Sequence, residues 1–210
     1  EYEQRFEDER KRLEQTATTD AARRMFRKAA IARQEQFLNR VGKHFNDQRT
    51  AYRKVVLDTT VAEATESAIV DHENPEHAND VRNATYNYYV SRGYSDKVAQ
   101  SMADEARSKL HLAVVKSLGV TNAVAAEAYL EKHKDQIDPT LRAGALEPLM
   151  ENVRLQRANE DLADLSSRHI LNTTDGDKAA IKSLRDKYKN NPKQLAASEK
   201  RLKNELIRLE

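Results

Sequence analysis

Residues 20–72 read DAARRMFRKAAIARQEQFLNRVGKHFNDQRTAYRKVVLDTTVAEATESAIVDH, and the predicted architecture depends on them more than on any other segment. It contains no proline and only one glycine, and its apolar side chains recur at steps of three and four residues. This is the period of an amphipathic α-helix. The residues that define the apolar stripe are Phe26, Ala30, Phe37, Val41, Phe45, Tyr52, Val55, Ala62 and Ile69. An unbroken helix here is about 80 Å long, more than a compact domain of this chain length can cover.

We therefore expect one part of the stripe to pack against other helices of this chain and another part to contact a protein partner. The candidate partner-contact residues are Phe26, Phe37, Val41, Phe45 and Tyr52. A break at residues 58–60 is the alternative to one continuous helix, because Asp58 and the two threonines after it can cap a new helix.

The composition favours an almost entirely helical protein. Of the 210 residues, 33% are charged, while only 5 are glycine and 4 are proline. The 36 basic and 34 acidic residues nearly balance, which argues against a protein that binds nucleic acid through an overall basic excess. The absence of cysteine excludes disulfides and thiolate metal sites. We expect no membrane span, because no apolar run approaches 18 residues.

The positions of proline, glycine and helix-capping residues predict an elongated all-α fold in three parts. Residues 1–75 form a long helical arm, with a break or kink at residues 16–20 and an end at Asn74-Pro75. Residues 76–172 form an antiparallel multi-helix subdomain, which opens with a short helix closed by Gly93. Residues 178–210 form a C-terminal helical hairpin, with helices at about 178–189 and 193–208.

Within the subdomain, the segment 95–171 is expected to supply the compact core. Ser95 caps a helix that ends at Gly119, and Thr121 or Asn122 opens the next one. A third helix starts at residues 138–139, and Pro148 is expected to kink or divide it. Residues 172–177 are predicted to be a loop.

The distribution of charge predicts one basic concentration in the chain, in its last 33 residues. Contact with DNA phosphates, independent of base sequence, is therefore a hypothesis for this region. Its candidate residues are Lys178, Lys182, Arg185, Lys189 and Lys193. A solvated helical face is the favoured interpretation, since Asp186, Glu199 and Glu205 dilute the positive charge.

No pattern in the sequence predicts catalysis, a cofactor or a metal. Residues 72–77, HENPEH, lack the spacing of a zinc-protease helix and contain a proline. Residues 175–177 favour a turn over a calcium loop, because the remaining ligands are missing. Ser108 and His111 lack a third orienting residue and a glycine-rich nucleophile turn, so a hydrogen-bonded core histidine is the favoured interpretation.

Residues 86–171 carry a pattern that resembles a helical region of internal virion proteins of tailed phages and prophages, the ejection proteins released with the genome. The pattern comprises Tyr89, Gly93, Ser108-x-x-His111-x-x-Val114-Val115-x-x-Leu118, Ala126-x-x-Tyr129, Ile137-Asp138-Pro139, Arg142, Leu146 and Leu149. The resemblance implies a helical segment that associates with itself or with other virion proteins. It also implies a location in the virion interior after synthesis in the host cytoplasm, and in the host cell envelope after ejection.

We therefore expect a non-enzymatic structural segment that acts in virion assembly and genome delivery. We also expect the chain to be a piece of a longer protein, because it begins without methionine; a catalytic domain can exist elsewhere in that parent. The alternative is an interaction adaptor of a cellular protein, either a coiled coil or a tetratricopeptide-like array. Residues 108–139 resemble one tetratricopeptide hairpin, although no second copy follows.

Overall fold

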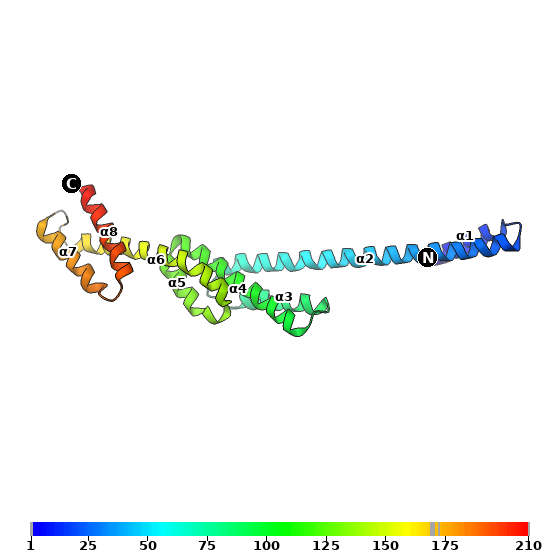
Figure 1. Cartoon of the computed structure of the whole chain (residues 1–210), viewed down its shortest axis with the longest axis horizontal. Coiled ribbons are helices and arrows are strands. Elements are labelled where there is room, and N and C mark those ends of the chain that lie inside the picture. Colours follow the sequence, from blue (N-terminus) through cyan, green and yellow to red (C-terminus); the bar gives the residue numbers. More distant parts are fainter. Residues whose placement is uncertain (1, 169–170, 172, 210) are drawn as a thin grey trace. The chain divides into compact units, whose positions relative to one another are not determined.

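The structure is a computed structural model that describes residues 2–168, 171 and 173–209, apart from the side chain of residue 3. In this part of the chain every regular element is helical, which confirms the predicted all-α class (Figure 1). The helices are α1 (Tyr2–Gln15), α2 (Asp20–Val70), α3 (Glu76–Ser91), α4 (Asp96–Thr121), α5 (Ala123–Lys132), the 3-10 turn η1 (Lys134–Gln136), α6 (Pro139–Arg168), α7 (Thr174–Lys187) and α8 (Pro192–Leu209).

The long helix predicted from the sequence is confirmed. Helix α2 is continuous over 51 residues, so Asp58 and its two threonines do not break it. The predicted break before it is also present: α1 ends at Gln15, and the Thr19 hydroxyl accepts a 3.2 Å hydrogen bond from the Ala22 amide, as an N-cap does.

By their packing, the residues divide into two units, Glu1–Val56 and Leu57–Glu210. The sequence places a boundary at residue 75, but the last turns of α2, from Leu57 onward, pack within the second unit. Residues Ala64 and Ala68 are buried in its core, and Leu57 is buried as well. The predicted stripe continued through Ala62 and Ile69; Ala62 is instead exposed and Ile69 only partly buried. Small alanine side chains let neighbouring helices approach closely, an effect that hydrophobic periodicity does not reveal.

The main core of the second unit lies where α2, α3, α4, α5 and α6 meet. Helix α4 contacts α3, α5 and α6, and it contributes Leu110, Val114 and Val115 to this core. Residues Val81 of α3 and Val153 of α6 are fully buried against it. Helices α4, α5 and the first part of α6 pack together as predicted for residues 95–171, and α3 and the end of α2 complete the same core; the C-terminal part of α6 packs into a different core.

A second core joins α6 to the C-terminal hairpin of α7 and α8. Its buried apolar residues are Leu165, Ala180, Leu184 and Leu202. The buried Asp161 of α6 accepts hydrogen bonds from Ser198 Oγ at 2.5 Å, Lys187 Nζ at 2.6 Å and the Tyr188 hydroxyl at 3.1 Å. One carboxylate therefore holds both helices of the hairpin to α6. Its hydrogen bond raises the pKa of Lys187 above the ordinary value.

Two predicted helix boundaries are wrong, and of the two effects expected of Pro148 the division of its helix is absent. Helix α4 runs through Gly119 to Thr121, and a Cβ at Gly119 would lie 3.7 Å from Leu149 Cδ1, so this glycine belongs to a closely packed site. Helix α6 is not divided at Pro148, although the proline lies inside it. Within the expected loop at residues 172–177, residue 172 lies outside the described residues, and residues 174–177 are helical because the Thr173 hydroxyl accepts a 3.2 Å hydrogen bond from the Gly176 amide and caps α7.

Other local predictions are confirmed. Gly93 has φ +83° and closes α3, a conformation that favours glycine. The Asn122 side chain accepts a 3.0 Å hydrogen bond from the Ala125 amide and opens α5. Asp138 accepts hydrogen bonds from the amides of Thr140 and Leu141 at 2.9 and 3.1 Å and opens α6.

Candidate protein-contact surface

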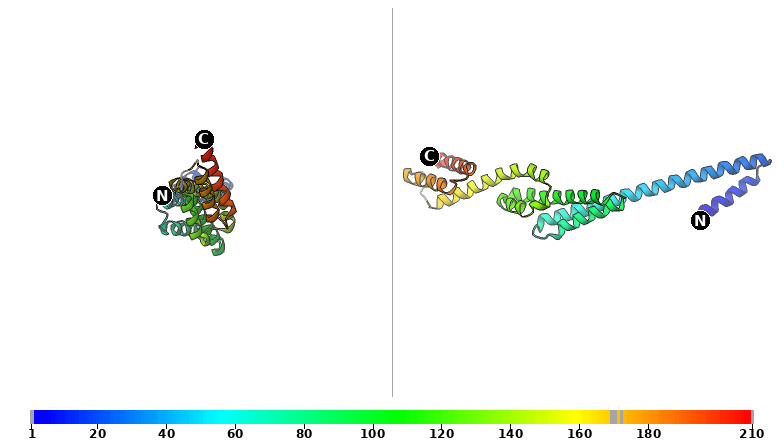
Figure 2. Two further views of the ribbon diagram at one scale, coloured as in Figure 1. Left: turned by 90° about the vertical axis from the view of Figure 1, so that its left-hand side faces the viewer. Right: turned by 60° about the horizontal axis from the view of Figure 1, so that its bottom comes forward.

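The first unit is a hairpin in which α1 folds back along the first part of α2 (Figure 2). The rings of Tyr2 and Phe37 stack with their centroids 4.9 Å apart. Closer to the turn, Arg27 of α2 donates a 3.0 Å hydrogen bond through Nε to Glu14 of α1. The contact holds the pKa of Glu14 below its ordinary value. Each of these contacts joins a residue of α1 to one of α2.

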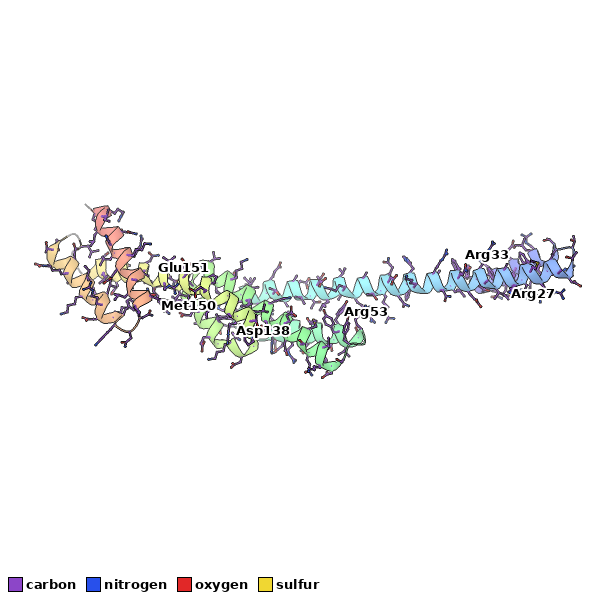
Figure 3. The ribbon with its side chains drawn as sticks, in the orientation of Figure 1. Arg27, Arg33, Arg53, Asp138, Met150 and Glu151 are labelled. Atoms are coloured by element: carbon purple, nitrogen blue, oxygen red, sulfur yellow. The ribbon has the colours of Figure 1, made fainter. Side chains whose placement is uncertain are left out.

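The α1–α2 contact lies on the predicted stripe of α2. On α2, Phe26, Ala30 and Gln34 are half-buried, whereas most of their neighbours are exposed. At 100° per residue, these three positions and Phe37 lie within an arc of about 80° on the helix surface. Helix α1 therefore covers the N-terminal part of the stripe. Figure 3 labels Arg27, which lies beside α1, and Arg33, one and a half turns further along α2.

The stripe continues beyond α1 on residues that we call the open stripe: Leu38, Val41, Phe45, Tyr52 and Val55. These side chains are exposed, Phe45 to 66% and Tyr52 to 71%. They lie within an arc of about 100° that overlaps the arc covered by α1. A row of exposed large apolar side chains on one helix face is typical of a protein contact surface.

The five partner-contact candidates thus fall in two groups. Phe37 stacks on Tyr2 of α1, and Phe26 is half-buried at the N-terminal end of the same stripe. Val41, Phe45 and Tyr52 belong to the open stripe and are available to another molecule.

A feature that the sequence-based interpretation missed is the charge of α2. Residues 20–56 contain ten Lys and Arg against three Asp and Glu, so the last 33 residues are not the only basic region of the chain. Residues 57–177 compensate with 21 acidic and 12 basic residues. A count of charge in windows along the sequence would have found this separation, which the near-neutral total conceals.

The basic residues of α2 have a defined position relative to the open stripe. At 100° per residue, Arg40 borders it on one side and Arg49 on the other, while Lys43 lies on the opposite face. Arg33 lies on the same side as Arg40, before the open stripe begins. The surface is therefore an apolar strip with cationic edges. Long basic side chains at such edges favour acidic residues on whatever covers the strip.

The DNA-contact candidates lie on the C-terminal hairpin. Lys178, Lys182 and Arg185 are exposed at steps of four and three residues, which places them on one face of α7. Arg185 Nε donates a 3.0 Å hydrogen bond to Glu199 Oε1 of α8, so part of its charge is neutralised. Lys189 is exposed in the turn between the two helices, and Lys193 is exposed in the first turn of α8.

His111 is a buried structural residue. Its Nδ1 lies 2.8 Å from the Tyr129 hydroxyl, and its Nε2 lies 3.2 Å from Gln136 Oε1. With that amide oxygen as acceptor, Nε2 carries the proton and Nδ1 accepts from the tyrosine. Burial, together with the nearby His133 ring, lowers the pKa of His111 to about 4. The two nitrogens thus link α4 to α5 and to η1, as the core-histidine interpretation predicts.

The Ser108 hydroxyl likewise forms hydrogen bonds within the folded chain. Its hydroxyl donates to the Asp104 carbonyl at 2.7 Å and accepts from the Asp138 amide at 3.0 Å. Among the described residues, no group of three or more His, Cys, Asp or Glu side chains is arranged to hold a metal ion. No helix in that same part of the chain is long and apolar enough to cross a bilayer.

Comparison of the chain with protein-family models, with curated proteins and with solved structures finds no match.

Proposed function

We propose that this chain is a non-enzymatic structural segment that works by helix-mediated association with another protein chain, through the open stripe of α2. The observation that carries the proposal is the contrast between apolar content and burial in the first unit. Among the side chains described in residues 2–56, none is buried, although α2 presents a row of aromatic and aliphatic residues there. Burying such side chains in a contact is favourable by roughly 25 cal/mol per Å² of apolar surface.

The resemblance of residues 86–171 to internal virion proteins of tailed phages supplies the biological setting of the proposal. In that setting the chain is part of a larger ejection protein inside the virion, where it contributes to assembly and genome delivery. Its partners are copies of itself or other virion proteins. The cellular adaptor alternative uses the same surface, so the parent gene and its neighbours separate the two settings.

Site-specific photocrosslinking tests the proposed contact. We would place a photoreactive phenylalanine analogue at Phe45, in the open stripe, and the same analogue at Asn46, an exposed neighbour on another face of α2. The full-length parent would be expressed in its own host. We expect protein adducts from position 45 and few from position 46. Equal yields of protein adducts from both positions, or none from position 45, would contradict the proposed function.

A further inference from the structure

We infer that the open stripe is the docking site for a helix of a partner protein that has an apolar face and acidic flanks, laid in line with α1. This inference deepens the proposed function and rests on it, because it names the chemistry of the partner. Two independent observations carry it: the contact that α1 already makes with the same face of α2, and the charge at the edges of the stripe.

The first observation is the continuity of the two parts of the stripe. Helix α1 lies on the face of α2 that carries Phe26 and Ala30, and its contact reaches as far as the stacked ring of Phe37. The open stripe begins at the next residue and follows the same face. A helix is therefore the kind of element that this face accepts, and a second helix placed beyond α1 would extend an existing interface. Residues 38–55 offer it a length of about 27 Å.

The second observation is charge. Residues 33–55 carry six Lys and Arg against two Asp and Glu. Arg40 and Arg49 stand at the edges of the open stripe and Arg33 lies just before it, where all three can pair with carboxylates on a docked helix. The chain itself provides the precedent, since Arg27 of α2 pairs with Glu14 of α1.

The same observations disfavour the other occupants. Two copies of α2 packed stripe to stripe would bring two positively charged helices together, which like-charge repulsion opposes. A flat lipid surface would meet α1 first, because α1 stands on the same face with a diameter of about 10 Å. A nucleic-acid backbone would satisfy the arginines but would leave Val41, Phe45 and Val55 in contact with water and phosphate.

The test measures the binding of two synthetic helical peptides to the full chain by fluorescence anisotropy at physiological salt. Both peptides carry the same leucine stripe; one has glutamate at its flanking positions and the other has lysine. We expect the glutamate peptide to bind at least about tenfold more tightly. Equal binding of the two peptides would overturn the inference.

Variants then locate the site. The double variant Phe45→Ser/Tyr52→Ser should weaken binding of the glutamate peptide by about tenfold or more, as loss of aromatic anchors does. Both side chains are mostly exposed, so the fold should be retained, which circular dichroism checks. The triple variant Arg33→Gln/Arg40→Gln/Arg49→Gln should abolish the preference for glutamate over lysine. The matched control Lys43→Gln, on the opposite face, should leave the preference in place; loss of the preference in the control would count against the inference.

Two further arms separate failure of the inference from failure of the proposed function. Sedimentation of the chain alone shows whether it self-associates. A dimer that Phe45→Ser/Tyr52→Ser dissociates would overturn the inference and leave the proposed function standing, because the occupant would be a second copy. A DNA duplex or vesicles containing phosphatidylglycerol that displace the glutamate peptide at lower concentration than unlabelled peptide would overturn both. No binding in any arm, with no effect of the stripe variants, would also overturn both.

Discussion

The two packing units use the same helix, α2, in opposite ways. In the second unit its last turns bury small side chains, Ala64 and Ala68, within a core shared by five helices. In the first unit its larger side chains, such as Phe45 and Tyr52, remain exposed. Along α2, therefore, burial of a side chain depends on how many helices surround it. Its size and hydrophobicity alone do not decide it.

The hydrogen bonding of the two units differs in the same way. In the second unit, buried polar groups such as His111 and Asp161 bond to partners on other helices. In the first unit, ion pairs such as Arg12 with Glu9 lie on an exposed helix surface. Exposed pairs contribute little to stability, whereas buried networks fix one arrangement of helices. The second unit therefore has the marks of a folded core, whereas the apolar and charged side chains of the first unit remain largely exposed.

The largest expected effect comes from placing the same charge in each unit. Val153→Asp buries an unpaired carboxylate at a fully buried position and should lower the free energy of unfolding by more than about 4 kcal/mol. Val41→Asp, at a position 47% exposed, should change it by less than about 0.5 kcal/mol. Urea denaturation followed by circular dichroism measures both. Similar losses in the two variants would remove the distinction between the units.

Acid should affect the second unit through His111. Its pKa in the folded chain is about 4, below the 6.5 of a free histidine, so the folded state favours the neutral ring. Neutral His111 therefore contributes about 3 kcal/mol to the free energy of unfolding. This contribution is fully present above pH 6.5 and is lost as the pH falls toward 4. Burial also lowers the pKa of His133, which acts in the same direction.

Urea denaturation at several pH values between 7 and 4 measures this loss. His111→Gln should flatten the dependence of stability on pH, whatever its effect on stability at pH 7. His44→Gln, at an exposed position of the first unit, should leave the dependence as it is. An unchanged slope in His111→Gln would show that other groups cause the loss.

The carboxylate of Asp161 should be worth about 2 kcal/mol to the attachment of the C-terminal hairpin. Asp161→Ala removes the acceptor of Ser198 and leaves that buried hydroxyl without it. Asp164→Ala, one turn further along α6, breaks only an ion pair with Arg168 at the surface and should cost less than about 0.5 kcal/mol. Hydrogen exchange of α7 and α8 amides would show the loosening directly. Equal exchange in both variants would mean that apolar packing alone holds the hairpin.

The smallest effects should have opposite signs at two glycines. Gly93→Ala places a side chain at φ +83° and should cost about 1 kcal/mol. Gly42→Ala lies within α2, where an added Cβ meets nothing within 4 Å, and should stabilise the helix by up to about 1 kcal/mol. Thermal denaturation of the chain measures the first, and helix content by circular dichroism the second. A destabilising Gly42→Ala would indicate that this part of α2 is not the regular helix described.

Much of the fold was predictable because its signals are local. Each of these signals acts within a few residues of the chain: the three- and four-residue spacing of apolar side chains along α2, the cap residues Asn122 and Asp138, and the turn at Gly93. The predictions failed where packing outweighs local preference. Gly119 was predicted to end α4, but it lies against Leu149, and the helix continues past it. The C-terminal half of the stripe was predicted to run through Ala62, whereas the side chains buried in the core there are those of Ala64 and Ala68.

The candidate surface was predictable in part for the same reason. Its apolar residues follow from periodicity, and its charge could have been counted. That Phe26 is half-buried and Phe37 stacks on Tyr2 of α1, while Phe45 and Tyr52 are mostly exposed, could not be read from the period, because one continuous stripe runs through all four positions.

By itself, the sequence determined that the chain is helical, that α2 is long, and where most helices start, because hydrogen bonds within a helix and at its caps join residues close in the chain. Only the tertiary structure decided which face of α2 is buried, where His111 and Asp161 find their partners, and which aromatic side chains stay exposed. Those outcomes depend on contacts between residues far apart in the chain, whose free energy no local pattern contains.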